Sequence, residues 1–386
     1  MSGLTPRERV LTAIEHKEPD RIPIDFASFT VSIYAHPPYG YNALCEYLGL
    51  TDVAEPVALF GSYVLNIDER LQDRLGNDFR SIQMGLPLPE VIRPDYIRLF
   101  PYGLLYKSVG GPFWYPDLAN APLKNAKTVQ DIDNYEYWPD PNDPVYTVGA
   151  RERARALHEQ TDYAIIAEPL IPEHHCTNYQ WLRGFEQWFL DMHRNHDLYD
   201  ALMEKLVGSS IEIARRFYGE VGNYIDVAHV SGDDMGWQHG PFLSPKDYEE
   251  FIKPWIKKYL DAVRGLTKAK FFYHCDGAVF PLIEDFIDMG FDIISPVTAR
   301  AKDMDPAGLK KRYGDRITFH SGIDMQEVMS SGSVEEVRAH VTSVVRELAP
   351  GGGYIFGVMV VPDFPPANVV TAFDTAMEVG RYPIRR

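Results

Sequence analysis

From about residue 150 onward, short apolar segments alternate regularly with amphipathic ones, and helix caps, glycines or prolines separate them. Strands that alternate with helices in this way form right-handed βαβ units, whose strands lie parallel in one sheet. Strands are expected at residues 21–26, 163–168, 224–230, 270–274, 291–295, 316–320 and 353–358. Helices are expected after Thr5 and at 148–160, 181–193, 197–218, from 245, 281–289, 305–314, 333–348 and 368–378.

The number of strands favours a closed barrel over an open sheet. An eighth strand has room in residues 28–150, a stretch rich in Pro, Gly and Tyr in which the alternation at 96–100 suggests a hairpin. A doubly wound sheet is the alternative, but no GxGxxG follows the first strand. We therefore predict one (β/α)8 TIM barrel domain over residues 1–386, with an N-terminal helix and an irregular inserted lobe at about 28–150.

Charge and composition restrict the partners and the compartment. A net charge of -17 disfavours nucleic acid and anionic membrane surfaces as partners. The chain has three cysteines without a CxxC pair, a polar N-terminus and no apolar run of transmembrane length. These features predict a cytoplasmic protein, and a homodimer is left open.

Polar residues stand where the expected strands end, which is the catalytic edge of a (β/α)8 barrel. His274 and Asp276 are two residues apart, so in extended geometry they share one face and suit a metal ion or acid–base chemistry. The adjacent Asp233 and Asp234 point opposite ways, so one can serve the site while the other caps a helix. The remaining strand-end candidates are Asp25, Glu168, His320 and Met359.

Other polar clusters have plainer explanations. His229 alternates with apolar residues and is expected to be a hydrogen-bonded core histidine. The adjacent His174 and His175 cannot easily share one ion. Tyr34 and His36 lie in an aromatic loop after the first strand, which is either a wall for a planar ligand or a surface turn.

Several segments together resemble the uroporphyrinogen decarboxylase-like superfamily, and within it the corrinoid-dependent methyltransferases that include O-demethylases. The segments are Thr5–Pro23, Gly232–Gly236 with Ser244, Pro245 and Pro254, the region of His274, Ser321–Asp324, Gly351–Tyr354 and Pro365–Asn368. They cover the N-terminal helix and most of the chain after residue 225. The resemblance implies a (β/α)8 barrel with a deep mouth. It also implies two candidate reactions, decarboxylation and methyl transfer.

The chain departs from both of these patterns. The decarboxylases hold a tetracarboxylate porphyrin with arginines near the N-terminus, whereas Ala27–Tyr41 contains neither Arg nor Lys. The thiol methyltransferases bind zinc through His-x-Cys and a later Cys. Here His274 matches, but Asp276 replaces the first Cys and the late position falls near Met359–Val361. In the hard–soft classification of metal ligands, histidine with carboxylates is a harder ligand set than thiolates. Such a ligand set suits an oxygen-bearing substrate.

We therefore predict transfer of a methyl group from a small methylated ether or amine to the cobalt of a corrinoid (cobalamin), carried by a partner protein or free. The predicted catalytic residues are His274, Asp276, Glu168, Asp233 and Asp234. The predicted metal ligands, for zinc if a metal is bound, are His274, Asp276 and Glu168. The predicted substrate-binding residues are Asp25, Tyr34, His36, His320 and Met359. The alternatives are a decarboxylase or other lyase and a non-catalytic corrinoid-binding protein.

Overall fold

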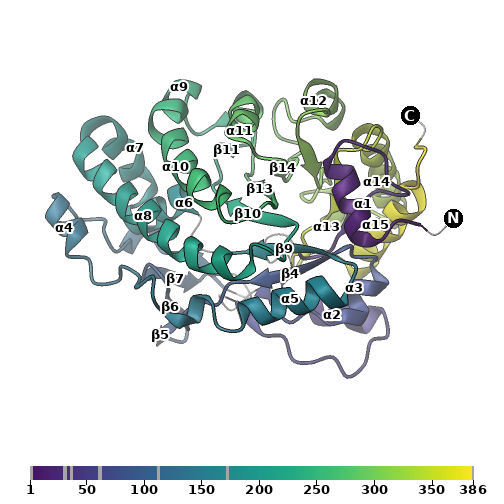
Figure 1. Cartoon of the computed structure of the whole chain (residues 1–386), viewed down its shortest axis with the longest axis horizontal. Helices are drawn as coiled ribbons and strands as arrows, with labels where there is room; N and C mark the ends of the chain where they lie inside the picture. The colour runs from purple at the N-terminus through teal and green to yellow at the C-terminus, as the bar shows by residue number, and fades with distance from the viewer. Residues whose placement is uncertain are drawn as a thin grey trace.

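An eight-stranded parallel sheet, nearly closed into a barrel, forms the centre of the computed structural model (Figure 1). The structure describes residues 3–28, 33–34, 38–59, 63–110, 114–170 and 174–384. Helices surround the sheet, which makes the fold a (β/α)8 TIM barrel, as expected. In order around the sheet the strands are β1 (Ile24–Asp25), β16 (Tyr354–Gly357), β15 (Thr318–His320), β14 (Ile293–Ser295), β13 (Lys270–His274), β10 (Val227–Ser231), β9 (Ala164–Glu168) and β4 (Phe79–Gln83).

The eighth strand, β4, lies inside the irregular segment and completes the barrel beside β1. The seam between them is made by Asp78, whose N–H donates to the Ile24 carbonyl at 2.9 Å and whose Oδ2 accepts the Ile24 N–H at 2.8 Å. Arg9 and Arg21 each approach this buried carboxylate to 2.7 Å. A buried carboxylate needs such partners, since an uncompensated charge is costly there.

The N-terminal helix α1 (Pro6–Ile14) closes one end of the barrel. It begins with the expected capping box between Thr5 and Glu8. Its Val10 and Ile14 pack with side chains from inside the barrel, and the Gly353 N–H donates to the Ala13 carbonyl. The interior side chains in this cluster are Phe79, Ala164, Ile166, Val227, Phe272, Ile293 and Ile355. The carboxyl ends of the strands form the opposite rim.

The outer helices follow the strands in sequence and cover the outside of the sheet (Figure 1). One expectation was wrong: the single helix predicted at 181–193 is two helices separated at Gly184. Its φ of 97° is a conformation that glycine adopts at no steric cost. Besides α1, the described α-helices are α2 (Tyr41–Tyr47), α3 (Glu69–Arg74), α4 (Val129–Asp133), α5 (Ala150–Gln160), α6 (His175–Arg183), α7 (Phe185–Arg194), α8 (His196–Val221), α9 (Pro245–Asp247), α10 (Lys253–Arg264), α11 (Ile283–Met289), α12 (Pro306–Tyr313), α13 (Val328–Ser331), α14 (Val334–Leu348) and α15 (Pro366–Val379).

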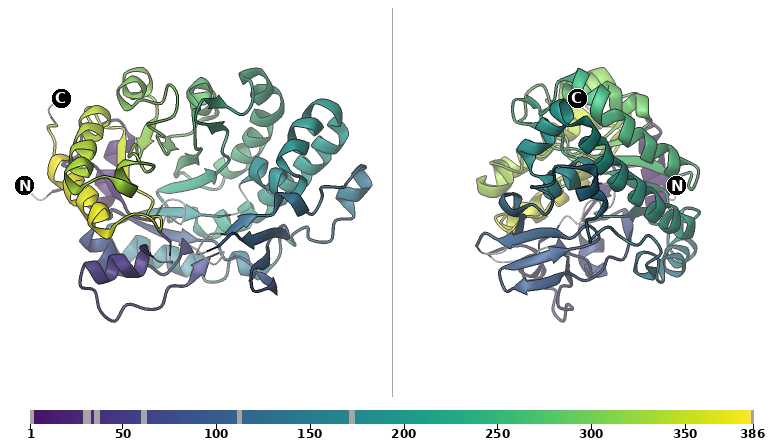
Figure 2. Two further views of the ribbon diagram at one scale, coloured as in Figure 1. Left: turned by 180° about the vertical axis from the view of Figure 1, so that it is seen from behind. Right: turned by 90° about the vertical axis from the view of Figure 1, so that its left-hand side faces the viewer.

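The inserted segment also contains a four-stranded antiparallel sheet. Its strands are β5 (Glu90–Arg93), β6 (Tyr96–Leu99), β7 (Leu104–Ser108) and β8 (Trp114–Pro116), in that order. The hairpin expected at 96–100 is confirmed, since β6 pairs with β5 and β7. This sheet lies at the end of the molecule opposite the two chain termini (Figure 2). None of the described helices is long and apolar enough to cross a membrane.

Candidate active site

A polar layer stands directly above the apolar barrel interior. Ile166, Val227, Phe272 and Ile293 belong to the interior cluster. Side chains two residues apart on a strand point the same way. The next inward positions toward the carboxyl rim are therefore Glu168, His229, His274 and Ser295. The Phe272 ring forms a floor between two histidines, with ring-centroid distances of 5.0 Å to His229 and 6.0 Å to His320.

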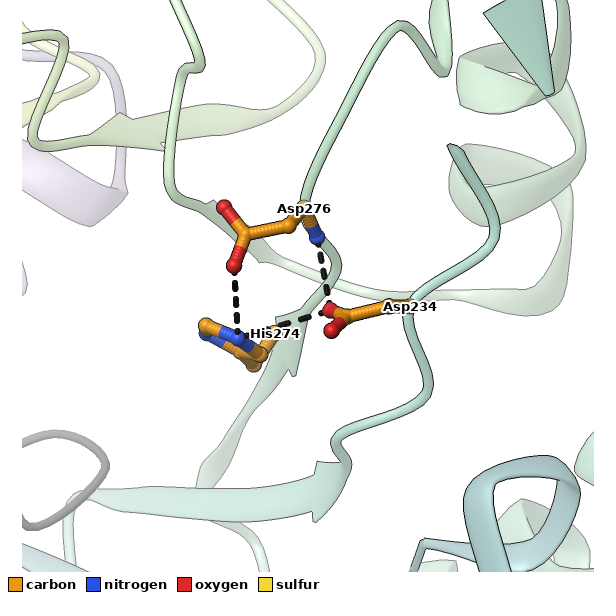
Figure 3. A group of neighbouring side chains, drawn as sticks. All are labelled: Asp234, His274 and Asp276. Carbon is orange, nitrogen blue, oxygen red and sulfur yellow. Dashed lines mark hydrogen bonds and ion pairs between the residues drawn. The ribbon is translucent and has the colours of Figure 1, made fainter. Parts of the chain in front are cut away.

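Asp234, His274 and Asp276 form a compact group at this rim (Figure 3). His274 ends β13, Asp276 follows it, and Asp234 comes from the loop after β10. His274 Nε2 lies 3.6 Å from Asp234 Oδ1 and 3.5 Å from Asp276 Oδ2. The Asp276 N–H donates to Asp234 Oδ1 at 2.9 Å, and the Thr298 hydroxyl lies 3.4 Å from Asp276 Oδ1. These contacts orient both carboxylates toward the imidazole.

The two carboxylates favour the charged form of His274. Burial works against the imidazolium, but the contact with Asp276 and the negative charges of Asp276 and Asp234 outweigh it and raise the His274 pKa to about 9. In the same way, the contact with His274 overcomes the effect of burial and lowers the pKa of Asp276. The group therefore attracts a positive charge, either a proton on His274 or a metal cation.

The geometry fits a metal cation. A tetrahedral site with bonds of about 2.1 Å separates its ligand atoms by roughly 3.4 Å. The two His274–carboxylate distances of 3.5 and 3.6 Å are close to that value. Three protein ligands leave a fourth position for a substrate atom, as in catalytic zinc sites. The group that could hold a metal ion joins Asp234 to His274 and Asp276, whereas the sequence named Glu168 as the third ligand.

Glu168 instead pairs with His229, its neighbour on β10. Glu168 Oε2 lies 2.8 Å from His229 Nδ1, and both side chains are 2% exposed. His229 Nε2 lies 3.0 Å from the Ser231 carbonyl oxygen, and the register of β10 against β13 shifts between these two residues. His229 is buried and hydrogen-bonded, as expected. Its partner, however, is an acid at the rim formed by the carboxyl ends of the strands.

Asp25, His320 and Ser295 form a second buried chain on the other side of Phe272. His320 Nε2 lies 3.1 Å from Asp25 Oδ2, and His320 Nδ1 lies 2.8 Å from the Ser295 hydroxyl. Asp25 Oδ1 also accepts the Ser28 N–H at 3.0 Å. The sequence picked out Asp25 and His320 separately, and Ser295 is the member it did not assign.

The adjacent aspartates point apart, as their spacing implies. Asp233 is fully buried, and its Oδ1 accepts the Thr177 N–H at 2.8 Å in the first turn of α6. Burial raises its pKa to about 6, against the effect of that hydrogen bond. Asp233 therefore holds a helix terminus, while Asp234 lies with His274 and Asp276.

The predicted aromatic wall is partly described. The Tyr34 N–H donates to the Val360 carbonyl at 3.1 Å, so the loop after β1 runs beside the half-buried Met359. His36 lies outside the described residues.

His174 is the site residue that sequence reasoning set aside. Its ring centroid lies 6.1 Å from that of His229. A Cβ on Gly232 would come within 2.3 Å of His174 Nε2, so this glycine makes room for the ring. Burial, followed by the charges of His229, His274 and His175, lowers the His174 pKa well below the ordinary value. The only sequence signal was the glycine directly after β10, which has no meaning without the fold.

Comparisons with known proteins agree with the fold. Residues 176–379 match the family model described as uroporphyrinogen decarboxylase (URO-D). Uroporphyrinogen decarboxylase from Pseudoalteromonas translucida is 28% identical over 138 residues, which are 33% of this chain and 36% of that protein. Uroporphyrinogen decarboxylase from Trichodesmium erythraeum is 28% identical over 140 residues, 36% of this chain and 38% of that protein. The match thus spans little more than a third of these relatives' lengths.

A solved methyltransferase structure from Methanosarcina mazei aligns with 97% of this chain and 99% of its own, with a TM-score of 0.59. At 18% sequence identity, this likeness shows the shared fold alone.

Proposed function

The chain belongs to the uroporphyrinogen decarboxylase family, and from that premise we propose that it is a methyltransferase. It moves a methyl group from a small methylated ether or amine to the cobalt of a corrinoid carried by a partner protein. The observation that carries this proposal is the group of Asp234, His274 and Asp276 at the catalytic rim. A methyl group bound to oxygen or nitrogen is hard to displace unless the leaving atom is stabilised, and this group offers such stabilisation.

Asp234, His274 and Asp276 would hold a divalent cation, with zinc as the first candidate for one nitrogen and two oxygen ligands. When bound, the cation supplies a Lewis acid for the leaving atom of the methyl donor. The chain's own residues prepare the site. The Asp276 N–H fixes Asp234, Thr298 lies against Asp276, and the imidazole stands between the two carboxylates.

The surrounding charges favour a neutral or cationic methyl donor. Asp25 adds a further acid to the two carboxylates of Asp234 and Asp276 at this rim. Arg300, in the loop after β14, is already engaged by Asp324 and Glu327. A small methylated compound would bind over Phe272, with Tyr34 and Met359 at one side.

A decarboxylase is the second candidate, because the family model and both relatives carry that description. The absence of Lys and Arg from residues 27–41 weighs against a porphyrin with four carboxylates, since the rim offers such an anion like charges. A corrinoid-binding protein without catalysis is the third, and the many ionisable groups at the rim weigh against it.

One anaerobic assay separates the three. The zinc-loaded protein is mixed with cob(I)alamin and pools of methyl ethers, methylamines and methyl thioethers, and methylcobalamin formation is followed by absorbance. Methyl transfer that disappears in His274→Ala supports the proposal. Carbon dioxide release from a carboxylic acid without any corrinoid would favour the decarboxylase, and cobalamin binding without turnover would favour the binding protein.

A further inference from the structure

The hydrogen bonds of His229 determine how many protons it shares with Glu168. The Ser231 carbonyl oxygen, 3.0 Å from Nε2, can only accept a hydrogen bond, so Nε2 carries a hydrogen. Nδ1 then faces Glu168 Oε2 at 2.8 Å. Two bare acceptor atoms repel each other at this distance, so a proton lies between them. Either Glu168 is a neutral acid, or His229 is an imidazolium beside a carboxylate.

The second histidine–carboxylate pair at the rim has no such requirement. His320 Nε2 faces Asp25, and its Nδ1 faces the Ser295 hydroxyl, which can donate. A neutral His320 can satisfy both contacts, so their geometry requires no extra proton in that chain. The two pairs differ in the second partner of the histidine, which is a carbonyl for His229 and a hydroxyl for His320. This difference makes the Glu168–His229 pair the one of these two that must hold a transferable proton.

Two features of β10 position His229 beside Glu168, and burial affects the charge of the pair. The Tyr218 hydroxyl donates to the His229 carbonyl at 2.8 Å and fixes the strand. The register of β10 against β13 shifts between His229 and Ser231, as at a β-bulge, and the Ser231 carbonyl there accepts from the ring. Bulges of this kind are common beside active sites, where they redirect a group. Burial also favours the neutral pair over a lone carboxylate.

We propose that the Glu168–His229 pair stores the proton that the leaving atom of the methyl donor takes up, with Glu168 as the catalytic residue and His229 as the positioning residue. This role rests on the proposed methyl transfer. The methyl–oxygen bond breaks and its electron pair stays on oxygen, while the new bond to the methyl carbon takes its electron pair from the cobalt(I) acceptor. The proton passes from Glu168 to that oxygen, so the demethylated product is an alcohol or phenol. The pair is left with one negative charge and regains a proton from water.

This role narrows the substrate class. The oxygen of a methyl ether leaves as an anion and needs a proton. The nitrogen of a quaternary methylammonium ion leaves as a neutral amine and needs none. A stored proton beside the metal group therefore selects methyl ethers as donors.

The test is Glu168→Gln, measured with methyl donors of different leaving groups. Glutamine keeps the size of the side chain and can donate to Nδ1 of a neutral His229, but it has no proton to give. Transfer from an alkyl methyl ether is expected to fall about 100-fold or more. Transfer from a nitrophenyl methyl ether or from tetramethylammonium is expected to change much less. The control is Glu284→Gln, which removes an exposed contact with Arg316. This variant is expected to leave the rate of methyl transfer from every donor unchanged.

A second measurement needs neither corrinoid nor substrate. The ¹⁵N-histidine NMR spectrum of the whole protein at neutral pH reports the protonation state of His229. One expected result is an imidazolium. The other is a neutral His229 ring together with an infrared carboxylic-acid band from an un-ionised Glu168. A neutral His229 beside an ionised Glu168 would overturn the proposal. Equal slowing of all donors by Glu168→Gln would also overturn it while leaving the methyltransferase function standing. A wild-type protein inactive with every donor would overturn that function and this role together.

Discussion

Asp25 and His320 are 295 residues apart in sequence, yet they bond at 3.1 Å across an intervening strand. β16 lies between β1 and β15, and its inward position at this level is Gly357. A Cβ there would lie 2.4 Å from His320 Nε2. The missing side chain is what allows the histidine to reach the aspartate.

Gly357→Ala is therefore expected to displace the His320 ring and lower the free energy of unfolding by about 1–3 kcal/mol. Urea unfolding measures the loss, and ¹⁵N-histidine NMR reports the altered His320 environment. The control is Gly240→Ala, where a Cβ would meet nothing within 4 Å. An equal effect of both substitutions would contradict the packing argument.

Metal affinity should depend on pH through His274. Its pKa of about 9 means that the metal-free imidazole is protonated at neutral pH, so a bound cation must displace that proton. Zinc affinity is expected to rise about tenfold per pH unit below pH 9 and then to level off. Chelator competition at several pH values measures this slope. A zinc affinity that does not change with pH would show that His274 is not a ligand. The variant Asp276→Asn should weaken zinc binding at every pH.

The barrel seam depends on a buried charge. Asp78→Asn leaves Arg9 and Arg21 without their shared carboxylate, which is expected to cost about 3–5 kcal/mol in the free energy of unfolding. The control is Asp261→Asn, which removes an exposed pair with Lys257 and should cost less than about 1 kcal/mol. Both losses are measured by urea unfolding, and comparable values would show that the seam does not depend on Asp78.

Asp233 should make stability depend on pH in the direction opposite to that of an ordinary paired carboxylate. Its folded pKa of about 6 lies above the ordinary aspartate value of 3.8, so its favourable contribution is complete below about pH 4 and is lost as the pH rises through 6. In Asp233→Asn, the side-chain oxygen still accepts the Thr177 N–H but no longer ionises. The difference in unfolding free energy between pH 4 and pH 7, measured with chelator present, should change by about 3 kcal/mol relative to the wild type. An unchanged difference would show that Asp233 titrates normally.

The architecture and the pairing of His274 with Asp276 follow from local features of the sequence. Alternating strands and helices require a parallel sheet, and helix starts such as Thr5 with Glu8 are local hydrogen-bond patterns. The placement of His274 and Asp276 on one side also follows from local geometry, because they are two residues apart at a strand end. Interactions over a few residues suffice for these features.

The other pairings, between strands and between side chains of the site, depend on the tertiary structure. β4 stands just before a proline-rich stretch and is not distinguished in the sequence, and it is identified by its pairing with β9. Asp234 rather than Glu168 joins His274 because the loop after β10 returns to β13, while Glu168 faces its neighbour His229. Which side chains meet at a barrel rim depends on strand order, bulges and the space left by glycines. These are long-range properties that no local pattern encodes.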